Sequence, residues 1–301
     1  MATEPIQETA AAVAQKLPLS PLGRPRRARR RTNFWSTLIF YVVIGFFMLN
    51  LLAMVLTVVL DSLGEEWFTT WLPRGLFTMQ WYAYEVSDHD IVQLLVNTLV
   101  VAIATTLVSL LIGFPAAYVL ARKKFRFKSV LMGLYLLPML VPPLAYGIPL
   151  ATVLLRYIGG ELPGVILINI VPVLPFVILI LTPFIEQVDV SLESASRMLG
   201  ANRFQTFLRI ILPLVVPGLL TAGVLTIVRV IAMFELTYLV ANADALTLVV
   251  TLYGDAFASG MRPEQAINAM AVIYMLTTMS LLGIALIFVK PTQFVVRLKG
   301  R

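Results

Sequence analysis

Two charged residues, Arg229 and Glu235, lie in an apolar stretch long enough to cross a lipid bilayer. A charge at the centre of a spanning helix costs about 2.5–3.5 kcal/mol on insertion scales, so each needs a partner or water. On one continuous helix, residues six apart point in different directions, so these two should not pair with each other. Two interpretations stay open. Either both charges face a water-lined solute route, or Glu235 reaches the membrane surface while Arg229 bonds a neighbouring subunit.

Prolines accompany other polar residues in the apolar stretches. Proline removes a backbone donor and bends a helix, and bends open gaps between helices or simply shape their packing. The relevant prolines are Pro138, Pro142, Pro143, Pro149, Pro172 and Pro175. Near them we place a candidate solute pathway, because irregular backbone inside a membrane is tolerated where it lines a cavity. Its predicted residues are Tyr146, Asn169, Arg229, Glu235 and Tyr238.

Most enzyme chemistry lacks its essential residue in this chain. There is no cysteine and only one histidine, His89, so neither a thiolate nor a histidine-based metal cluster or catalytic dyad is expected. His89 is expected to be a solvated loop residue. The sequence has no G-x-x-x-x-G-K-[ST] loop to hold the phosphates of a nucleotide. We therefore predict no catalytic residue, no metal and no cofactor bound by this chain.

The composition indicates an all-α membrane protein. Hydrophobic residues make up 59% of the 301 residues and charged residues only 13%, and the mean hydropathy is +0.89. Six apolar blocks reach the length needed to span a bilayer as helices. They lie at 35–60, 92–121, 129–155, 164–185, 214–240 and 266–289. The net charge of +7 does not indicate nucleic acid as a partner, because the basic residues cluster beside these blocks.

The distribution of basic residues predicts the orientation. Lysine and arginine concentrate in the N-terminal tail, in the connections after the second and fourth blocks, and at the C-terminus. By the positive-inside rule, both termini are cytoplasmic. Residues 1–34 are expected to form a disordered basic tail beside anionic headgroups, and residues 290–301 a cytoplasmic C-terminal tail. Residues 61–91 are expected to form an extracytoplasmic loop, with Trp67, Trp71 and Trp81 along the outer interface.

The connector DVSLESASRMLGANRFQTFLRIILP, residues 189–213, is longer than a simple link requires. Asp189 or Ser191 can cap a first short helix, predicted over about 191–199. Gly200 can end it in a left-handed conformation, and Asn202 with Gln205 resembles a capping box for a second helix. On this second helix an apolar face is expected to pack beneath the spanning helices. That face consists of Phe204, Phe207, Leu208 and Ile211.

The same connector carries a family resemblance. Gly200, Ile210, Leu212 and Pro213 fall at the spacing EAA, three residues, Gly, nine residues, I-x-L-P. This motif is typical of the permease subunits of type I ATP-binding-cassette importers, which the chain resembles over 92–289. The register places Ser194, Ala195 and Ser196 on the EAA triplet, with Glu193 one position before it and Ala201 after the glycine. The wording SASRMLGA looks closer to the polyamine and opine branch than to the maltose branch.

The resemblance implies that 191–199 is a coupling helix, which docks on a separate ATPase subunit. The contact residues it implies are Leu192, Glu193, Ser194, Ala195, Ser196, Met198, Leu199, Gly200 and Ala201. It also implies a bacterial inner-membrane complex with a second permease, two ATPase subunits that use ATP and Mg, and an extracytoplasmic solute-binding protein. The implied solute is small, polar and organic, polyamine- or opine-like or else a sugar or polyol. The alternative function is an ion-coupled secondary transporter that uses Arg229 and Glu235.

Overall fold

The computed structural model describes residues 34–65, 75, 77–257 and 262–288, and every regular element in these ranges is a helix. The chain divides into two compact units, residues 1–53 and 54–301, and the rest of the fold concerns the second. The predicted basic tail, Trp67, Trp71 and the C-terminal tail lie outside the described residues. Helix α2 (Phe34–Ser62) agrees with the first predicted span, and within Thr37–Ser62 an apolar stretch of 18 residues has a mean hydropathy of 2.6.

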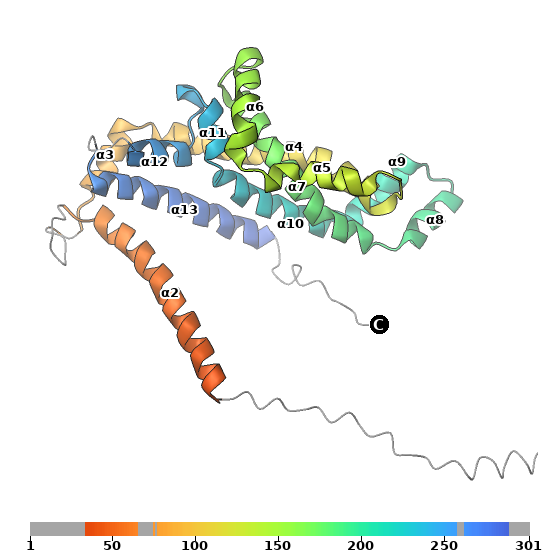
Figure 1. Cartoon of the computed structure of the whole chain (residues 1–301), viewed down its shortest axis with the longest axis horizontal. Coiled ribbons are helices and arrows are strands. Elements are labelled where there is room, and N and C mark those ends of the chain that lie inside the picture. The colour runs from red at the N-terminus through yellow and green to blue at the C-terminus, as the bar shows by residue number, and fades with distance from the viewer. Residues whose placement is uncertain (1–33, 66–74, 76, 258–261, 289–301) are drawn as a thin grey trace, which may run out of the picture. The chain divides into compact units, whose positions relative to one another are not determined.

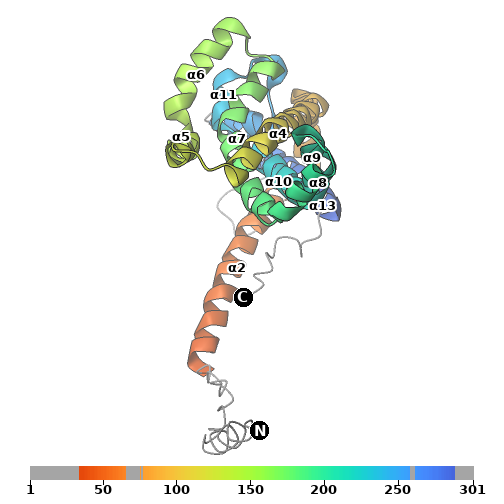
Figure 2. The ribbon, with the colours of Figure 1, turned by 90° about the vertical axis from the view of Figure 1, so that its right-hand side faces the viewer.

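Three long helices form the core of the second unit: α4 (Ile91–Arg122), α7 (Leu162–Glu186) and α10 (Leu212–Ile231). They lie side by side (Figures 1 and 2), and each packs against the other two. Gly113 of α4 lies so near α7 that a Cβ would come within 2.7 Å of Val177. Because apolar side chains at 0% exposure run along α7, including Ile168 and Leu181, this helix is the centre of the packing.

The prediction of a single helix over 129–155, bent at its prolines, was wrong. The chain forms α5 (Lys128–Leu140) and α6 (Pro143–Tyr157), which meet at 93° (Figure 2). Val141 is extended because it precedes a proline, and the consecutive prolines at 142 and 143 donate no backbone hydrogen bonds. By contrast, Pro172 and Pro175 lie buried inside an uninterrupted α7.

The prediction of one helix over 214–240 was also wrong at both ends. Helix α9 (Arg203–Thr206) continues through the π-helical turn η1 (Phe207–Ile211) directly into α10. The Leu212 N–H bonds the Phe207 carbonyl, which places the wide turn just before Pro213, a residue without a backbone donor. At the other end α10 stops at Ile231, and a separate short helix α11 (Glu235–Val240) follows.

The remaining elements surround this core. They are α3 (Gln80–Asp88), α8 (Val190–Met198), η2 (Ala243–Ala245), α12 (Leu248–Phe257) and α13 (Glu264–Phe288). Helices α3 and α12 were not predicted as separate elements. Within the described ranges, five helices are long and apolar enough to cross a membrane, or six if α5 and α6 count as one span.

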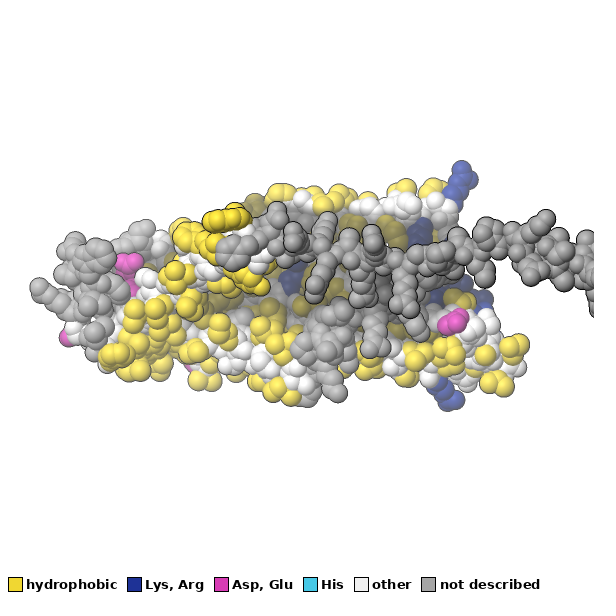
Figure 3. Space-filling view, turned by 90° about the horizontal axis from the view of Figure 1, so that it is seen from below, with side chains coloured by type: hydrophobic (Ala, Val, Ile, Leu, Met, Phe, Trp, Pro, Cys, Tyr) yellow, Lys and Arg dark blue, Asp and Glu magenta, His cyan; other side chains and the backbone are white. Residues whose placement is uncertain are grey.

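The two ends of the second unit differ. Helices α3 and α12 lie at one end and α8 at the other (Figure 1). Apolar side chains cover much of the length between them, and dark-blue basic side chains gather towards the α8 end (Figure 3). The basic connections after α4 and after α7 meet there, because Arg122, Lys123, Lys124, Arg197 and Arg203 line one hollow.

Candidate functional site

Helix α8 is bounded by the caps that the sequence predicted. The Ser191 N–H donates to Asp189 Oδ1 at 2.8 Å, and this backbone bond holds the pKa of the Asp189 carboxyl below its usual value. Gly200 has φ of +85°, in the left-handed region that favours glycine. Asn202 and Gln205 then form a reciprocal capping box. The predicted glycine elbow is therefore confirmed.

One face of α8 is tied to α4 through a buried carboxylate. Glu193 is only 3% exposed, and its Oε1 lies 2.8 Å from Arg122 Nε. The Tyr118 hydroxyl donates to Glu193 Oε2 at 2.8 Å, and Arg122 also donates to the Val188 carbonyl. A further ion pair to Arg197 is longer, at 3.7 Å. Since both Arg122 and Tyr118 belong to α4, the position of α8 depends on this contact.

Ser196 strengthens the same face. It is 5% exposed, and its hydroxyl lies 2.9 Å from the Thr206 hydroxyl on α9. Of the residues predicted to contact an ATPase, Glu193 and Ser196 therefore face into the chain. Their surroundings indicate that they position α8 and α9.

The other face of α8 is apolar and exposed. Met198 is 83% exposed and Leu199 is 89% exposed, and Leu192, Ser194 and Ala195 also lie on the surface. The apolar face predicted for the second short helix is only partly correct. Phe207 packs against Phe114, with ring centroids 4.7 Å apart, and Ile211 is buried. Phe204 and Leu208 instead remain exposed.

The structure brings three of the five predicted pathway residues together. The charges of Arg229 and Glu235 both act on the Tyr146 hydroxyl, and α11, which carries Glu235, packs against α6 and α7. The Arg229 guanidinium lies over the Phe176 ring, 4.9 Å from its centroid. Arg229 Nε and the Tyr146 hydroxyl oxygen are buried and have no hydrogen-bond partner among the described residues.

Asn169 and Tyr238 have other surroundings. Asn169 is fully buried and donates to the Thr237 hydroxyl at 2.9 Å, which ties α7 to α11. Its Oδ1 has no hydrogen-bond partner among the described residues. Tyr238 is 53% exposed and contacts the rings of Phe234 and Tyr253, both with centroids 5.7 Å away.

Sequence reasoning missed a polar junction at the start of α4. Asn97 is 1% exposed and donates to the carbonyls of Asp244 and Leu246 at 2.8 and 2.9 Å. The Leu248 N–H, at the start of α12, donates to the Thr98 hydroxyl at 3.0 Å. These bonds satisfy two carbonyls of the segment between α11 and α12 and the first backbone amide of α12. The adjacent polar residues Asn97 and Thr98, near the start of the apolar block 92–121, were the sequence signal that could have indicated this junction.

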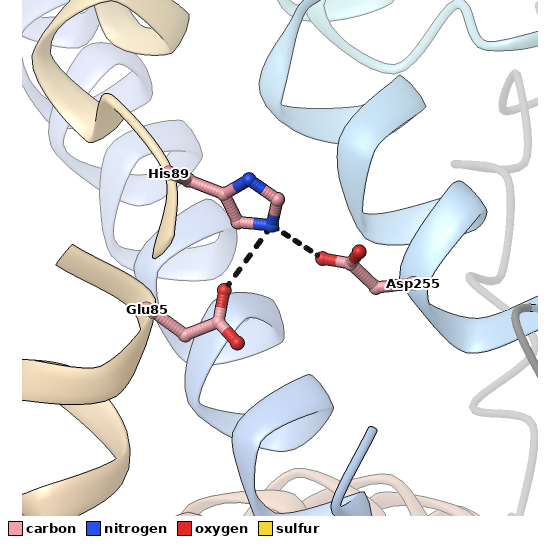
Figure 4. Close-up of side chains that lie close together, drawn as sticks. All are labelled: Glu85, His89 and Asp255. Atoms are coloured by element: carbon pink, nitrogen blue, oxygen red, sulfur yellow. Dashed lines mark hydrogen bonds and ion pairs between the residues drawn. The ribbon is translucent and has the colours of Figure 1, made fainter. Parts of the chain in front are cut away.

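The expectation that His89 is solvated was wrong. His89 is half-buried and its Nε2 lies 3.0 Å from Asp255 Oδ2 (Figure 4). Glu85, one helical turn earlier, is fully buried, and burial raises the pKa of its carboxyl while Arg262 acts in the opposite direction. The i, i+4 spacing of Glu85 and His89 was visible in the sequence, but Asp255 is 166 residues away from His89.

These observations define a polytopic membrane protein: several apolar helices, polar side chains on α6, α10 and α11, and a braced helix with an exposed apolar face at the basic end. The chain belongs to the family of binding-protein-dependent transport system inner membrane components, which it matches over residues 109–292. The interpretation as an ion-coupled secondary transporter is therefore set aside.

Relatives of several solute classes resemble this chain. It is 32% identical over 184 residues to the molybdate/tungstate transport system permease protein WtpB of Pyrococcus abyssi, covering 60% of this chain and 74% of the relative. It is 28% identical over 193 residues to the spermidine/putrescine transport system permease protein PotB of Escherichia coli, covering 58% and 70%. The fold is shared with a bacterial alginate ABC transporter whose structure was solved in complex with a periplasmic protein that binds an alginate pentasaccharide. The two structures match with a TM-score of 0.63 and 13% sequence identity, over 86% of this chain and 98% of the transporter chain. The chain is thus a permease of an ATP-binding-cassette importer.

Proposed function

We propose that α8 is the coupling helix through which a separate ATPase subunit drives this permease. The observation that supports the proposal is the contrast between its two faces. Met198 and Leu199 are almost fully exposed, whereas Glu193 on the opposite face is buried against Arg122. Large exposed apolar side chains beside small ones suit a protein interface. A helix braced on α4 can transmit a push from its partner to the spanning helices.

The solute route passes Tyr146, Arg229 and Glu235. Buried polar atoms without partners are costly, so the free Arg229 Nε and Tyr146 hydroxyl favour a polar ligand or water beside them. Arg229 suits a carboxylate and Glu235 an ammonium group. A small organic solute that carries both charges, as an opine does, agrees with this pair. The relatives' oxyanion and polyamine solutes are the alternatives.

The complex around this chain follows from the same proposal. A second permease completes the pathway, two ATPase subunits use ATP and Mg, and an extracytoplasmic binding protein delivers the solute. In a bacterial inner membrane, both termini are cytoplasmic, because the basic connections meet at the α8 end. Alternating access then consists of movement of α8 coupled to opening and closing of the spanning helices.

Co-purification of the ATPase subunit tests the coupling helix. Leu199→Asp places a charge on the exposed apolar face and should greatly reduce ATPase recovery, while membrane insertion stays normal. Phe127→Asp is the matched control, since Phe127 is 67% exposed in the α4–α5 connection and not on α8. Equal ATPase recovery with Leu199→Asp and with the unmodified chain would exclude this face as the docking surface.

Uptake by the reconstituted complex tests the solute route. Arg229→Gln and Glu235→Gln should each reduce uptake while basal ATP hydrolysis continues, and each variant should lose preference for solutes of one charge. If only Arg229→Gln reduces uptake and molybdate competes with the solute, the solute is an oxyanion. Unchanged uptake in both variants would remove these residues from the route.

A further inference from the structure

A group of charged side chains joins α3 to α12, at the end of the second unit opposite α8 (Figure 1). Arg262 Nη1 lies 3.2 Å from Glu85 Oε1, and Arg262 Nε lies 3.1 Å from Asp255 Oδ1. Arg262 also pairs with Asp88. One oxygen of each of the carboxylates of Glu85 and Asp255 is therefore held by the same guanidinium group.

The second oxygen of each carboxylate points to His89 (Figure 4). His89 Nε2 lies 3.0 Å from Asp255 Oδ2 and 3.7 Å from Glu85 Oε2. Glu85 is 0% exposed, and its Oε2 has no hydrogen-bond partner among the described residues. A buried carboxylate oxygen without a partner is costly, so an additional positive charge at this point would stabilise the site.

The charges of the group do not balance. Three carboxylates, Glu85, Asp88 and Asp255, face the single guanidinium of Arg262, so the formal charges of these four groups sum to minus two. The side chain of Asp88 is 43% exposed to solvent, whereas those of Glu85 and Asp255 are only 0% and 10% exposed. Buried charges in proteins are usually paired or bound to a metal ion. A divalent cation would supply the missing charge.

We propose that Glu85, His89 and Asp255 bind a divalent transition-metal ion, with Zn²⁺ as the best match to their chemistry. Their candidate ligand atoms all lie within 4.8 Å of one another. Zinc takes nitrogen and oxygen ligands at about 2.0–2.2 Å, so modest side-chain rotations would close the site. Three protein ligands leave a fourth position for water.

Arg262 is compatible with the metal, because it holds Oε1 and Oδ1 while the ion would bind Oε2 and Oδ2. In this arrangement Arg262 orients the ligands from the second coordination shell. The bound ion would cross-link α3, which precedes the spanning core, to α12, which lies near its C-terminal end. Zinc would therefore stabilise the packing of α3 on the rest of the second unit.

The sequence makes this site unusually easy to test, since His89 is the only histidine and the chain has no cysteine. The full chain should be purified in detergent with an affinity tag free of histidine, stripped with a chelator and titrated with ZnCl₂. We expect one bound zinc per chain by elemental analysis, a higher unfolding temperature, and imidazole scattering in the zinc X-ray absorption spectrum. His89→Gln should weaken zinc binding at least about tenfold and abolish the imidazole signal.

Glu161→Gln is the matched control, because Glu161 is an exposed carboxylate whose side chain caps nothing, and zinc binding should not change. Absence of zinc binding by the unmodified chain would overturn the proposal, as would binding without an imidazole ligand. Equal affinity of the unmodified chain and His89→Gln would do the same. If His89→Gln fails to fold, the spectrum of the unmodified chain still decides, since only His89 can supply the imidazole.

Discussion

Replacing Glu193 by glutamine should release α8 from α4 while leaving the spanning helices in place. The substitution keeps the size of the side chain and removes its charge. Arg122, whose side chain is 10% exposed, then loses its partner at 2.8 Å, and Tyr118 donates to a neutral amide instead of a carboxylate. Breaking a buried ion pair on one side leaves the other charge uncompensated in a region with little water.

The magnitude follows from burial. Removing one member of a buried pair costs about 3–5 kcal/mol. With a tenfold change for each 1.4 kcal/mol, the ratio of docked to released α8 should fall by roughly two to three and a half powers of ten. Arg197 provides the comparison: its side chain is 53% exposed and lies 3.7 Å from Glu193, so losing it should cost about 0–1 kcal/mol.

Hydrogen exchange of the purified full chain, followed by mass spectrometry, measures this difference directly. Amides of α8 should exchange much faster in Glu193→Gln than in the unmodified chain, whereas their exchange rates should hardly change in Arg197→Gln. The amides of α7 should stay protected in both variants. ATPase-subunit recovery should fall in parallel for Glu193→Gln. Equal, small effects of the two substitutions on α8 exchange would show that the ion pair does not hold the helix, and the reasoning would fail.

Three further outcomes are expected. Gly200→Val should destabilise the elbow by about 1–2 kcal/mol and reduce solute-stimulated ATP hydrolysis, whereas Gly200→Asn, which tolerates a left-handed backbone, should retain most of it. Gly218→Ala should reduce the free energy of unfolding by about 1–3 kcal/mol and lower the unfolding temperature, because the added Cβ would lie 2.6 Å from the Phe184 ring. Gly223→Ala is the control and should leave the unfolding temperature unchanged, since the nearest atom to its Cβ is 3.5 Å away. Asp189→Ala should speed exchange at the start of α8 at neutral pH. The pKa of the Asp189 carboxyl is lower in the folded chain than its ordinary value of 3.8. The carboxylate therefore stabilises α8 fully when the pH is above 3.8, and this stabilisation disappears as the pH falls through the lowered pKa. Below that pH, Asp189→Ala and the unmodified chain should exchange at the same rate.

The sequence by itself determined the elements whose causes are local. Long apolar blocks produced α2, α4, α7 and α13 near their predicted positions, because hydropathy depends on neighbouring residues alone. The Gly200 elbow and the Asn202 capping box were predictable for the same reason, since each depends on backbone groups within a few residues. The family resemblance over the connector rested on the same short-range pattern, and the family match over 109–292 confirms it.

Only the tertiary structure decided which distant groups meet. Glu193 was counted among the partner-contact residues, and nothing in its local pattern showed that Arg122 and Tyr118 would bury its carboxylate. His89 was expected in solvent, yet α12 brings Asp255 to it across 166 residues. The break after Ile231 likewise interrupts a run whose hydropathy favours continuity. Local patterns fix where a helix forms, but which faces of two helices meet depends on packing among segments that the sequence separates.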